Sequence, residues 1–229
     1  MTMLRSVLSP IPSYSMTCFK LFVSLYKRIQ SALTRFWWDD RDRNRKMSWI
    51  AWDTMTLPKD QGGLDFRDIE SINEAFLTKL SWRIVRYPKS LLARILLGKY
   101  CSSDSFLSAP IPSACSHGWR GIMLGRNIIS NNSGWAVGNG MNLNVWEDPW
   151  LSSSSQTRTM GPAPESLVNL TVAELFQSEE NVWSLEKIRQ FLPFHEQEIL
   201  AIKPSFSGAP DKLIWLNDKT REFTTKSGL

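Results

Sequence analysis

Residues 72–88 read INEAFLTKLSWRIVRYP, and this stretch carries the clearest fold signal in the chain. Its apolar residues recur every four positions, at Ile72, Phe76, Leu80 and Ile84. That spacing aligns them along one side of a helix. Three cations fall on a different side, at Lys79, Arg83 and Arg86. The helix should end at Tyr87, because the proline that follows disfavours helical geometry for the residue before it.

Helical periodicity also flanks this stretch. Residues 24–38 carry a second apolar stripe, with Ser24 as the expected N-cap. The cations of this segment fall outside the stripe, at Lys27, Arg28 and Arg35. A third helix is expected over residues 90–99. Residues 1–14 are expected to be extended, and residues 24–100 mainly α-helical.

Past residue 100 the segments become shorter. Helices are expected over residues 119–129, 172–176, 185–191 and 196–202. Residues 135–146 alternate around Asn139-Gly140, the strongest local signal for a hairpin turn. A second hairpin is expected between residues 212–216 and 221–225. The predicted fold class is therefore mainly α with small β-hairpins, an α+β arrangement.

These patterns divide the chain into four segments. Residues 1–100 form a helical region and residues 101–151 a helix with a hairpin. Residues 152–164, rich in Ser, Thr and Pro, form a flexible linker, and residues 165–229 a small helical segment with a hairpin. No apolar run approaches the roughly 18 residues of a membrane span, so no membrane partner is expected. The odd number of cysteines, without paired spacing, predicts free thiols in a reducing compartment.

Charge is concentrated in the first half. Residues 1–100 hold 17 Lys/Arg against 9 Asp/Glu, a net charge of +8, whereas residues 101–229 hold 10 against 13, a net charge of −3. The first 38 residues contain no acid. Four cations crowd one charged loop, at Arg41, Arg43, Arg45 and Lys46. Such a basic half predicts a polyanion-facing surface, with nucleic acid or anionic lipid as the usual candidates.

Two interpretations of these residues stay open. The four loop cations, together with Lys79, Arg83 and Arg86, are the expected nucleic-acid-binding residues, because they can neutralise phosphates without reading sequence. A charged row opposite an apolar stripe is equally what any soluble surface helix has. The same two interpretations apply to four tryptophans, Trp37, Trp38, Trp49 and Trp52. Their rings can stack on bases, but packing in the core is the commoner role of tryptophan.

No complete catalytic site emerges from the residues. His117 and His195 have no evident acid–base partner, and C-x13-C-x-H over residues 101–117 lacks the close ligand pairs of structural zinc sites. The pair Asp39-Asp40 lies at a predicted helix end among arginines. A solvated helix terminus is a simpler interpretation of this pair than a site for two-metal catalysis. We therefore expect no enzyme activity, no metal and no cofactor.

Several strings occur together in one order along the chain. They are PSYSMTCFK at 12–20, RFWW at 35–38, SWIAWD at 48–53, GGLDFRD at 62–68, AFLTKLSWR at 75–83 and VWEDPWL at 145–151. As a set they resemble plant non-LTR (LINE-type) retrotransposon polyproteins. The resemblance implies that this chain corresponds to the thumb and connector region of those polyproteins. That region follows the polymerase palm and precedes a zinc-binding module and a ribonuclease H domain.

The catalytic motifs of that family have no matching positions in this sequence. These are the aromatic-x-Asp-Asp polymerase motif, the zinc ligands and the ribonuclease H acids. The resemblance thus implies a non-catalytic fragment of an RNA-directed DNA polymerase polyprotein. Its partners would be an RNA or DNA backbone and the missing palm and ribonuclease H modules. The alternative is a structural or interaction protein, or a decaying open reading frame, without nucleic-acid binding.

The compartment also stays open. Analogy with retroelements gives the nucleus or the cytoplasm. The acid-free N-terminus, with Arg5, Lys20, Lys27 and Arg28, has instead the composition of a mitochondrial presequence.

Overall fold

The computed structural model describes residues 8, 10–39, 46–101, 105–177 and 181–228. The predicted loop cations Arg41, Arg43 and Arg45 lie outside these residues. Internal contacts divide the chain into two units, residues 1–128 with 224–229, and residues 129–223. The fold class is confirmed as mainly α with a small antiparallel sheet. The four-segment division expected from the sequence stays a prediction.

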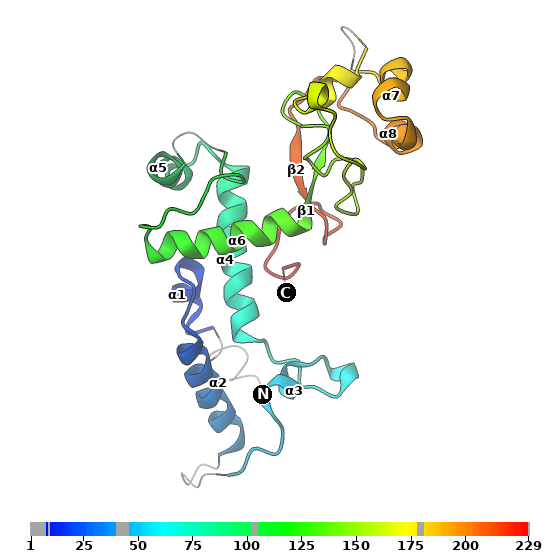
Figure 1. Cartoon of the computed structure of the whole chain (residues 1–229). Helices are drawn as coiled ribbons and strands as arrows, with labels where there is room; N and C mark the ends of the chain where they lie inside the picture. The colour runs from blue at the N-terminus through cyan, green and yellow to red at the C-terminus, as the bar shows by residue number, and fades with distance from the viewer. Residues whose placement is uncertain (1–7, 9, 40–45, 102–104, 178–180, 229) are drawn as a thin grey trace. The chain divides into compact units, whose positions relative to one another are not determined.

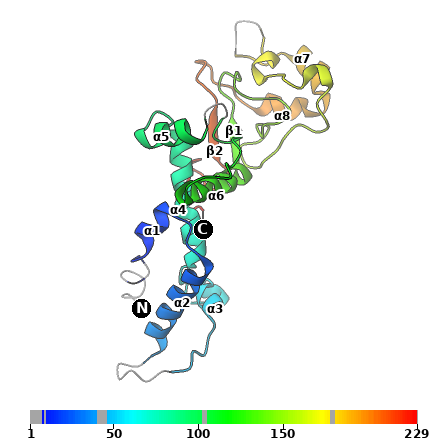
Figure 2. The same ribbon diagram turned by 60° about the vertical axis from the view of Figure 1, so that its left-hand side comes forward.

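The first unit is built around α4, the longest described helix (Figure 1). α1 and α2 contact it along its N-terminal part, α5 contacts it, and α6 crosses it in both views (Figure 2). The helices here are α1 (Ser13–Cys18), α2 (Val23–Trp38), α3 (Trp52–Thr56), η2 (Lys59–Gln61), α4 (Ile69–Arg86), α5 (Leu91–Tyr100) and most of α6 (His117–Asn132).

The helices predicted for this unit are confirmed, with shifts at their ends. α4 begins at Ile69 because the carboxylate of Asp68 accepts a hydrogen bond from the Ser71 amide at 2.8 Å, a side-chain N-cap. Ser24 is not the N-cap of α2: the helix starts at Val23 and has no side-chain cap bond. The extended segment expected over residues 1–14 is wrong at its end, because α1 begins at Ser13.

A buried amide fastens the turn between α1 and α2 to α4. Asn73 is fully buried, and its Oδ1 accepts from the Leu21 amide at 2.9 Å and from the Tyr26 hydroxyl at 2.6 Å. Its Nδ2 donates to the carbonyls of Met16 at 2.7 Å and Phe19 at 2.9 Å. Because all four bonds are made, this polar group is buried without an unsatisfied donor or acceptor.

Small residues let α6 approach α4 closely. A Cβ added at Gly125 would lie 2.6 Å from both the Leu77 carbonyl oxygen and the Ser81 Oγ. The Ser81 hydroxyl in turn lies 2.7 Å from the Ile122 carbonyl of α6 and 3.0 Å from the Leu77 carbonyl. Glycine is therefore required at this crossing for steric reasons.

The second unit packs short helices beside a two-stranded sheet (Figure 1). Strand β1 (Ser133–Ala136) pairs antiparallel with β2 (Lys212–Trp215), and Ser133 lies opposite Trp215. The core combines the 143–151 segment with the helical segments, through residues such as Val145, Trp150 and Ile188. The remaining helices are η3 (Glu165–Leu167), η4 (Val172–Leu175), α7 (Leu185–Phe191), η5 (Pro193–His195) and α8 (Glu196–Ala201). They confirm the three short helices predicted between residues 172 and 202.

The first predicted hairpin, over residues 135–146, is wrong in its pairing. Its first arm pairs with β2 rather than with its second arm. Its second arm bonds to the segment before η4: Val145 N donates to Leu170 O at 2.9 Å, and Val172 N donates to Leu143 O at 3.0 Å. Fully buried Leu143 and Val145 gain more by packing there than a local turn would give.

A carboxylate replaces the expected tight turn. Asp211 accepts hydrogen bonds from the amides of Gly138 at 2.7 Å, Gly140 at 2.9 Å and Asn142 at 3.2 Å. A residue 69 to 73 positions away in the sequence thus holds this loop. Local turn propensity carries no information about such a partner.

The second predicted hairpin is also wrong in its pairing. Residues 212–215 form a strand as expected, but its partner is β1. Residues 221–225 fold back without a strand, joined by a 3.0 Å bond from Trp215 N to Arg221 O. Arg221 has a φ of 62°, which interrupts extended backbone, and Asp218 caps the turn before it.

Candidate nucleic-acid interface

The predicted cations of α4 occupy its outer side. Lys79 and Arg83 are exposed and one turn apart, whereas Arg86 is half-buried. Neither Lys79 nor Arg83 forms an ion pair with any residue that the structure describes. Their charge is therefore available to a ligand.

Two acids at the other end of α4 share one cation. Lys20 binds Glu74 at 2.8 Å and Glu70 at 3.1 Å. Burial opposes the charge on this ammonium, but the hydrogen bonds to the two carboxylates outweigh it, so the pKa of Lys20 is raised. This pairing cancels one of the two carboxylate charges and leaves one negative charge at the start of the helix.

The outer side of α2 forms a second basic surface, which the site prediction did not include. Its exposed residues line a shallow hollow of about 380 Å³: Lys27, Arg28, Ser31, Ala32 and Arg35. None of the three cations has an acidic partner within the described chain. The signal for this surface was the absence of any acid among the first 38 residues.

A second hollow adjoins the first and brings in a loop cation. It measures about 250 Å³ and shares Ser31 and Arg35 with the first hollow. Its other lining residues are Thr34, Trp38, Asp39, Lys46 and Ser48. Asp39, the one acid among the described lining residues, accepts a hydrogen bond from the Lys46 backbone amide at 3.2 Å. We call the lining of the two hollows together the α2 face.

The structure separates the predicted cations into two groups. Trp37 packs edge-on against Phe66 with a centroid distance of 5.4 Å, so the C-terminal end of α2 lies beside the start of α4. α4 then rises by about 21 Å between Ile69 and Arg83, at 1.5 Å per residue. Lys46 accordingly joins the α2 face, while Lys79 and Arg83 lie farther along the unit.

The four candidate tryptophans differ in their surroundings. Trp37 and Trp52 pack against the core through Phe66, which supports a core role for both. Trp38 is half-buried and lines the α2 face. Trp49 is 77% exposed, which leaves its ring open to a partner.

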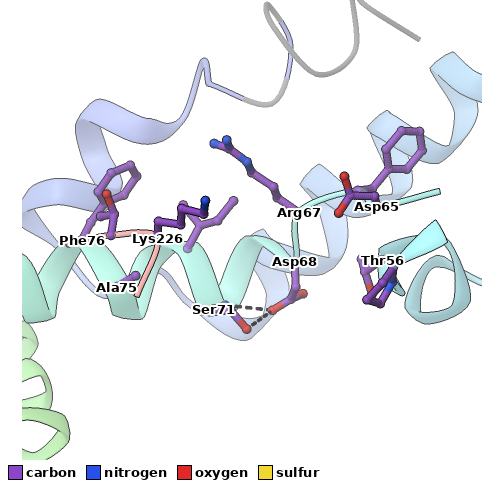
Figure 3. Close-up of a pocket in the computed structure, with 12 residues that line it drawn as sticks. Thr56, Asp65, Arg67, Asp68, Ser71, Ala75, Phe76 and Lys226 are labelled. Carbon is purple, nitrogen blue, oxygen red and sulfur yellow. Dashed lines mark hydrogen bonds between the residues drawn. The ribbon is translucent and has the colours of Figure 1, made fainter. Parts of the chain in front are cut away.

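A larger hollow of about 730 Å³ lies at the start of α4 (Figure 3). Its charged lining residues are Asp65, Arg67, Asp68 and Lys226. Figure 3 shows the carboxylate of Asp68 bound to Ser71, as the helix cap requires. Two acids beside two cations make this hollow less suitable for a polyanion than the α2 face.

Both histidines have structural partners. His195 was expected to lack an acid–base partner, but its Nδ1 lies 2.6 Å from Glu198 Oε2, three residues along the chain. Its Nε2 accepts from the Met160 amide at 3.0 Å, so both ring nitrogens are engaged. His117 Nε2 lies 2.8 Å from the Lys20 carbonyl, and its ring stacks with Phe19 and Phe22.

Among the described residues, no three His, Cys, Asp or Glu side chains are grouped to hold a metal, and Cys18 and Cys115 are free thiols. None of the described helices is both long and apolar enough to span a membrane.

Comparison with known proteins identifies relatives in Arabidopsis thaliana. The protein named "Putative ribonuclease H protein At1g65750" is 27% identical over 233 residues, which cover 99% of this chain but only 37% of that protein. This similarity is consistent with the retrotransposon-related origin that the sequence resemblance implies. No family model and no solved structure matches the chain.

A second relative matches over nearly its own full length. The "Uncharacterized mitochondrial protein AtMg00310" is 39% identical over 142 residues, which cover 62% of this chain and 92% of that protein. The chain therefore belongs to the same protein family as the mitochondrial protein AtMg00310 of Arabidopsis thaliana.

Proposed function

We propose that this chain is a non-catalytic part of a retroelement reverse transcriptase-related protein, and that its first unit binds the backbone of RNA or DNA. The observation that carries the proposal is the α2 face, where Lys27, Arg28 and Arg35 have no acidic partner within the described chain and the described lining of the two adjoining hollows contains one acid. Cations of this kind bind phosphates by displacing counterions, without reading sequence.

The place of the chain in a larger protein is part of the same proposal. The longer Arabidopsis relative extends well beyond the region that matches, and its name refers to ribonuclease H. We assign the matched region to a thumb and connector of the non-LTR type, which would hold template and product while other modules do the chemistry. An activity assay is the direct check: magnesium-dependent primer extension or RNA cleavage by the purified chain would contradict the non-catalytic role.

Salt dependence of binding tests the backbone contact. Each neutralised phosphate contributes about −0.9 to the slope of log K against log salt on duplex DNA. The three cations of α2 therefore predict a slope of about −2.7, and a loss of affinity of about 40-fold between 50 and 200 mM salt. The probe is a fluorescent RNA–DNA duplex, titrated with the full chain at several salt concentrations.

A matched pair of variants locates the contact. The triple substitution Lys27→Ala, Arg28→Ala and Arg35→Ala should reduce the slope by about 2.7. The control removes the same charge from exposed positions of the second unit, with Arg158→Ala, Lys203→Ala and Lys219→Ala. Equal effects of the two triple variants would mean that overall charge, and not the α2 face, is responsible.

One observation favours a second candidate, an interaction module without nucleic-acid contact. The start of the first unit exposes several large apolar side chains, at Tyr14, Phe19, Phe22 and Val23. Exposed apolar patches are typical of protein-binding surfaces. Absence of duplex binding at 50 mM salt would favour this candidate over the first.

A further inference from the structure

We infer that the α2 face takes single-stranded nucleic acid in preference to a duplex, with exposed aromatic rings stacking on unpaired bases beside the bound phosphates. This inference rests on the proposed function and names the ligand class of the same site.

Helical spacing puts rings on both flanks of a row of cations. Arg28 and Arg35 are seven residues apart, about two turns, so they lie nearly in line along the helix. Ala32 lies between them and leaves the row open. Phe36 follows Ala32 by four residues and flanks one side, and Trp38 follows Arg35 by three residues and flanks the other.

The rings are exposed although they are apolar. Phe36 is 50% exposed and Trp49 is 77% exposed, and Ser48, next to Trp49, lines the same hollow as Trp38. Uncovered rings of this size forgo the stabilisation that burial would give them. A ring face beside phosphate-binding cations is the arrangement by which proteins hold successive bases of a single strand.

Hydroxyl groups complete the lining. Ser31 belongs to both hollows and Ser48 to the second, and serine hydroxyls commonly donate to phosphate oxygens. Thr34 is engaged, because its hydroxyl donates to the Gln30 carbonyl at 2.8 Å. The lining therefore offers cations, neutral donors and the ring of Trp38, and Phe36 and Trp49 each follow a lining residue along the chain.

A duplex uses only part of this surface. Its phosphates can reach the cations and hydroxyls, but its base faces are already stacked on one another and are closed to Phe36 and Trp49. A single strand can use both kinds of contact. Base–aromatic stacking contributes about 1 to 3 kcal/mol per base, so one ring corresponds to roughly a tenfold gain in affinity.

The experiment compares a 15-nucleotide oligothymidine with a duplex of the same length, each fluorescently labelled, at one salt concentration. The full chain is used, with the double variant Phe36→Leu and Trp49→Leu, which removes the rings and keeps apolar side chains. The control is Phe206→Leu, because Phe206 is a 99% exposed ring of the second unit. Circular dichroism melting verifies that each variant folds.

The expected result is single-strand binding at least tenfold tighter than duplex binding. The double variant should lose most of this preference, while the control and all duplex affinities stay unchanged. Equal affinity for both ligands, or single-strand affinity insensitive to the double variant, overturns the inference and leaves the proposed backbone contact in place. Absence of binding to either ligand at 50 mM salt contradicts the proposed function itself.

A third arm of the experiment uses phosphatidylserine vesicles. Binding to vesicles without binding to either nucleic acid would contradict both proposals and would assign the α2 face to membrane binding.

Discussion

Replacing Asn73 by alanine is the sharpest test of how the α2 face is held in place. The substitution removes four hydrogen bonds and leaves two backbone carbonyls, one amide and one tyrosine hydroxyl without their partner. At about 1 kcal/mol per bond, the free energy of unfolding should fall by about 4 kcal/mol, since the small gain in helix propensity of alanine offsets little. Such a loss is a large part of the 5–15 kcal/mol that stabilises a typical domain.

The assay is urea unfolding of the full chain, followed by circular dichroism at 222 nm, because most helical residues belong to the first unit. The control is Asn131→Ala, which replaces an exposed asparagine of α6 and should change stability by less than about 0.5 kcal/mol.

The variant Asn73→Asp adds a second check. It keeps the two accepted hydrogen bonds but turns a carboxylate oxygen toward two carbonyls. It should therefore regain stability as the pH falls and the carboxylate takes up a proton. A loss below about 1 kcal/mol for Asn73→Ala would refute the reasoning, because the turn between α1 and α2 would then be held by other contacts.

The remaining predictions concern packing and charge. Gly125→Ala should destabilise the first unit by about 2 kcal/mol, because its Cβ would overlap backbone of α4. Gly98→Ala should instead stabilise α5 by up to about 1 kcal/mol, because its Cβ would meet nothing within 4 Å. Thermal melting compares the two variants. Asp211→Ala should cost about 3 kcal/mol, since three amides lose their acceptor, and hydrogen exchange should locate the loss at residues 138–142. Burial raises the pKa of Asp148, so the folded chain binds the carboxyl proton more tightly than the unfolded chain. The free energy of unfolding should therefore fall as the pH rises from the ordinary carboxyl pKa through the raised pKa. Asp148→Asn keeps an acceptor for the Asn144 amide, and its urea midpoint should exceed that of the unmodified chain above this window and show less pH dependence.

The two basic groups of the first unit make different demands on a ligand. Lys79 and Arg83 are two cations one turn apart on a helix, while the α2 face combines cations with hydroxyls and the Trp38 ring. A ligand that reaches from the C-terminal end of α2 to Arg83 must extend over about 20 Å, which corresponds to several nucleotides at 3.4 Å per phosphate in a B-form strand. Removing Lys79 and Arg83 should therefore weaken long oligonucleotides more than short ones.

The helices were accessible from sequence because their determinants are local. The apolar stripe from Ile72 to Ile84 has the period of a helix, and Pro88 marks its end, so α4 needed no tertiary information apart from its first three residues. The basic character of the first half was equally predictable from sequence, since charge is a property of composition.

The strand partners could not be predicted from sequence, because β1 and β2 are separated by 75 residues and the carboxylate of Asp211 reaches its loop from another part of the chain. The same holds for the candidate site: the charges on α2 are visible in sequence, but their meeting with Lys46 and the exposure of Phe36 depend on which side of the helix packs against the core. Periodicity acts over one or two turns, whereas long-range pairing depends on burial and on hydrogen-bond partners that only folding brings together.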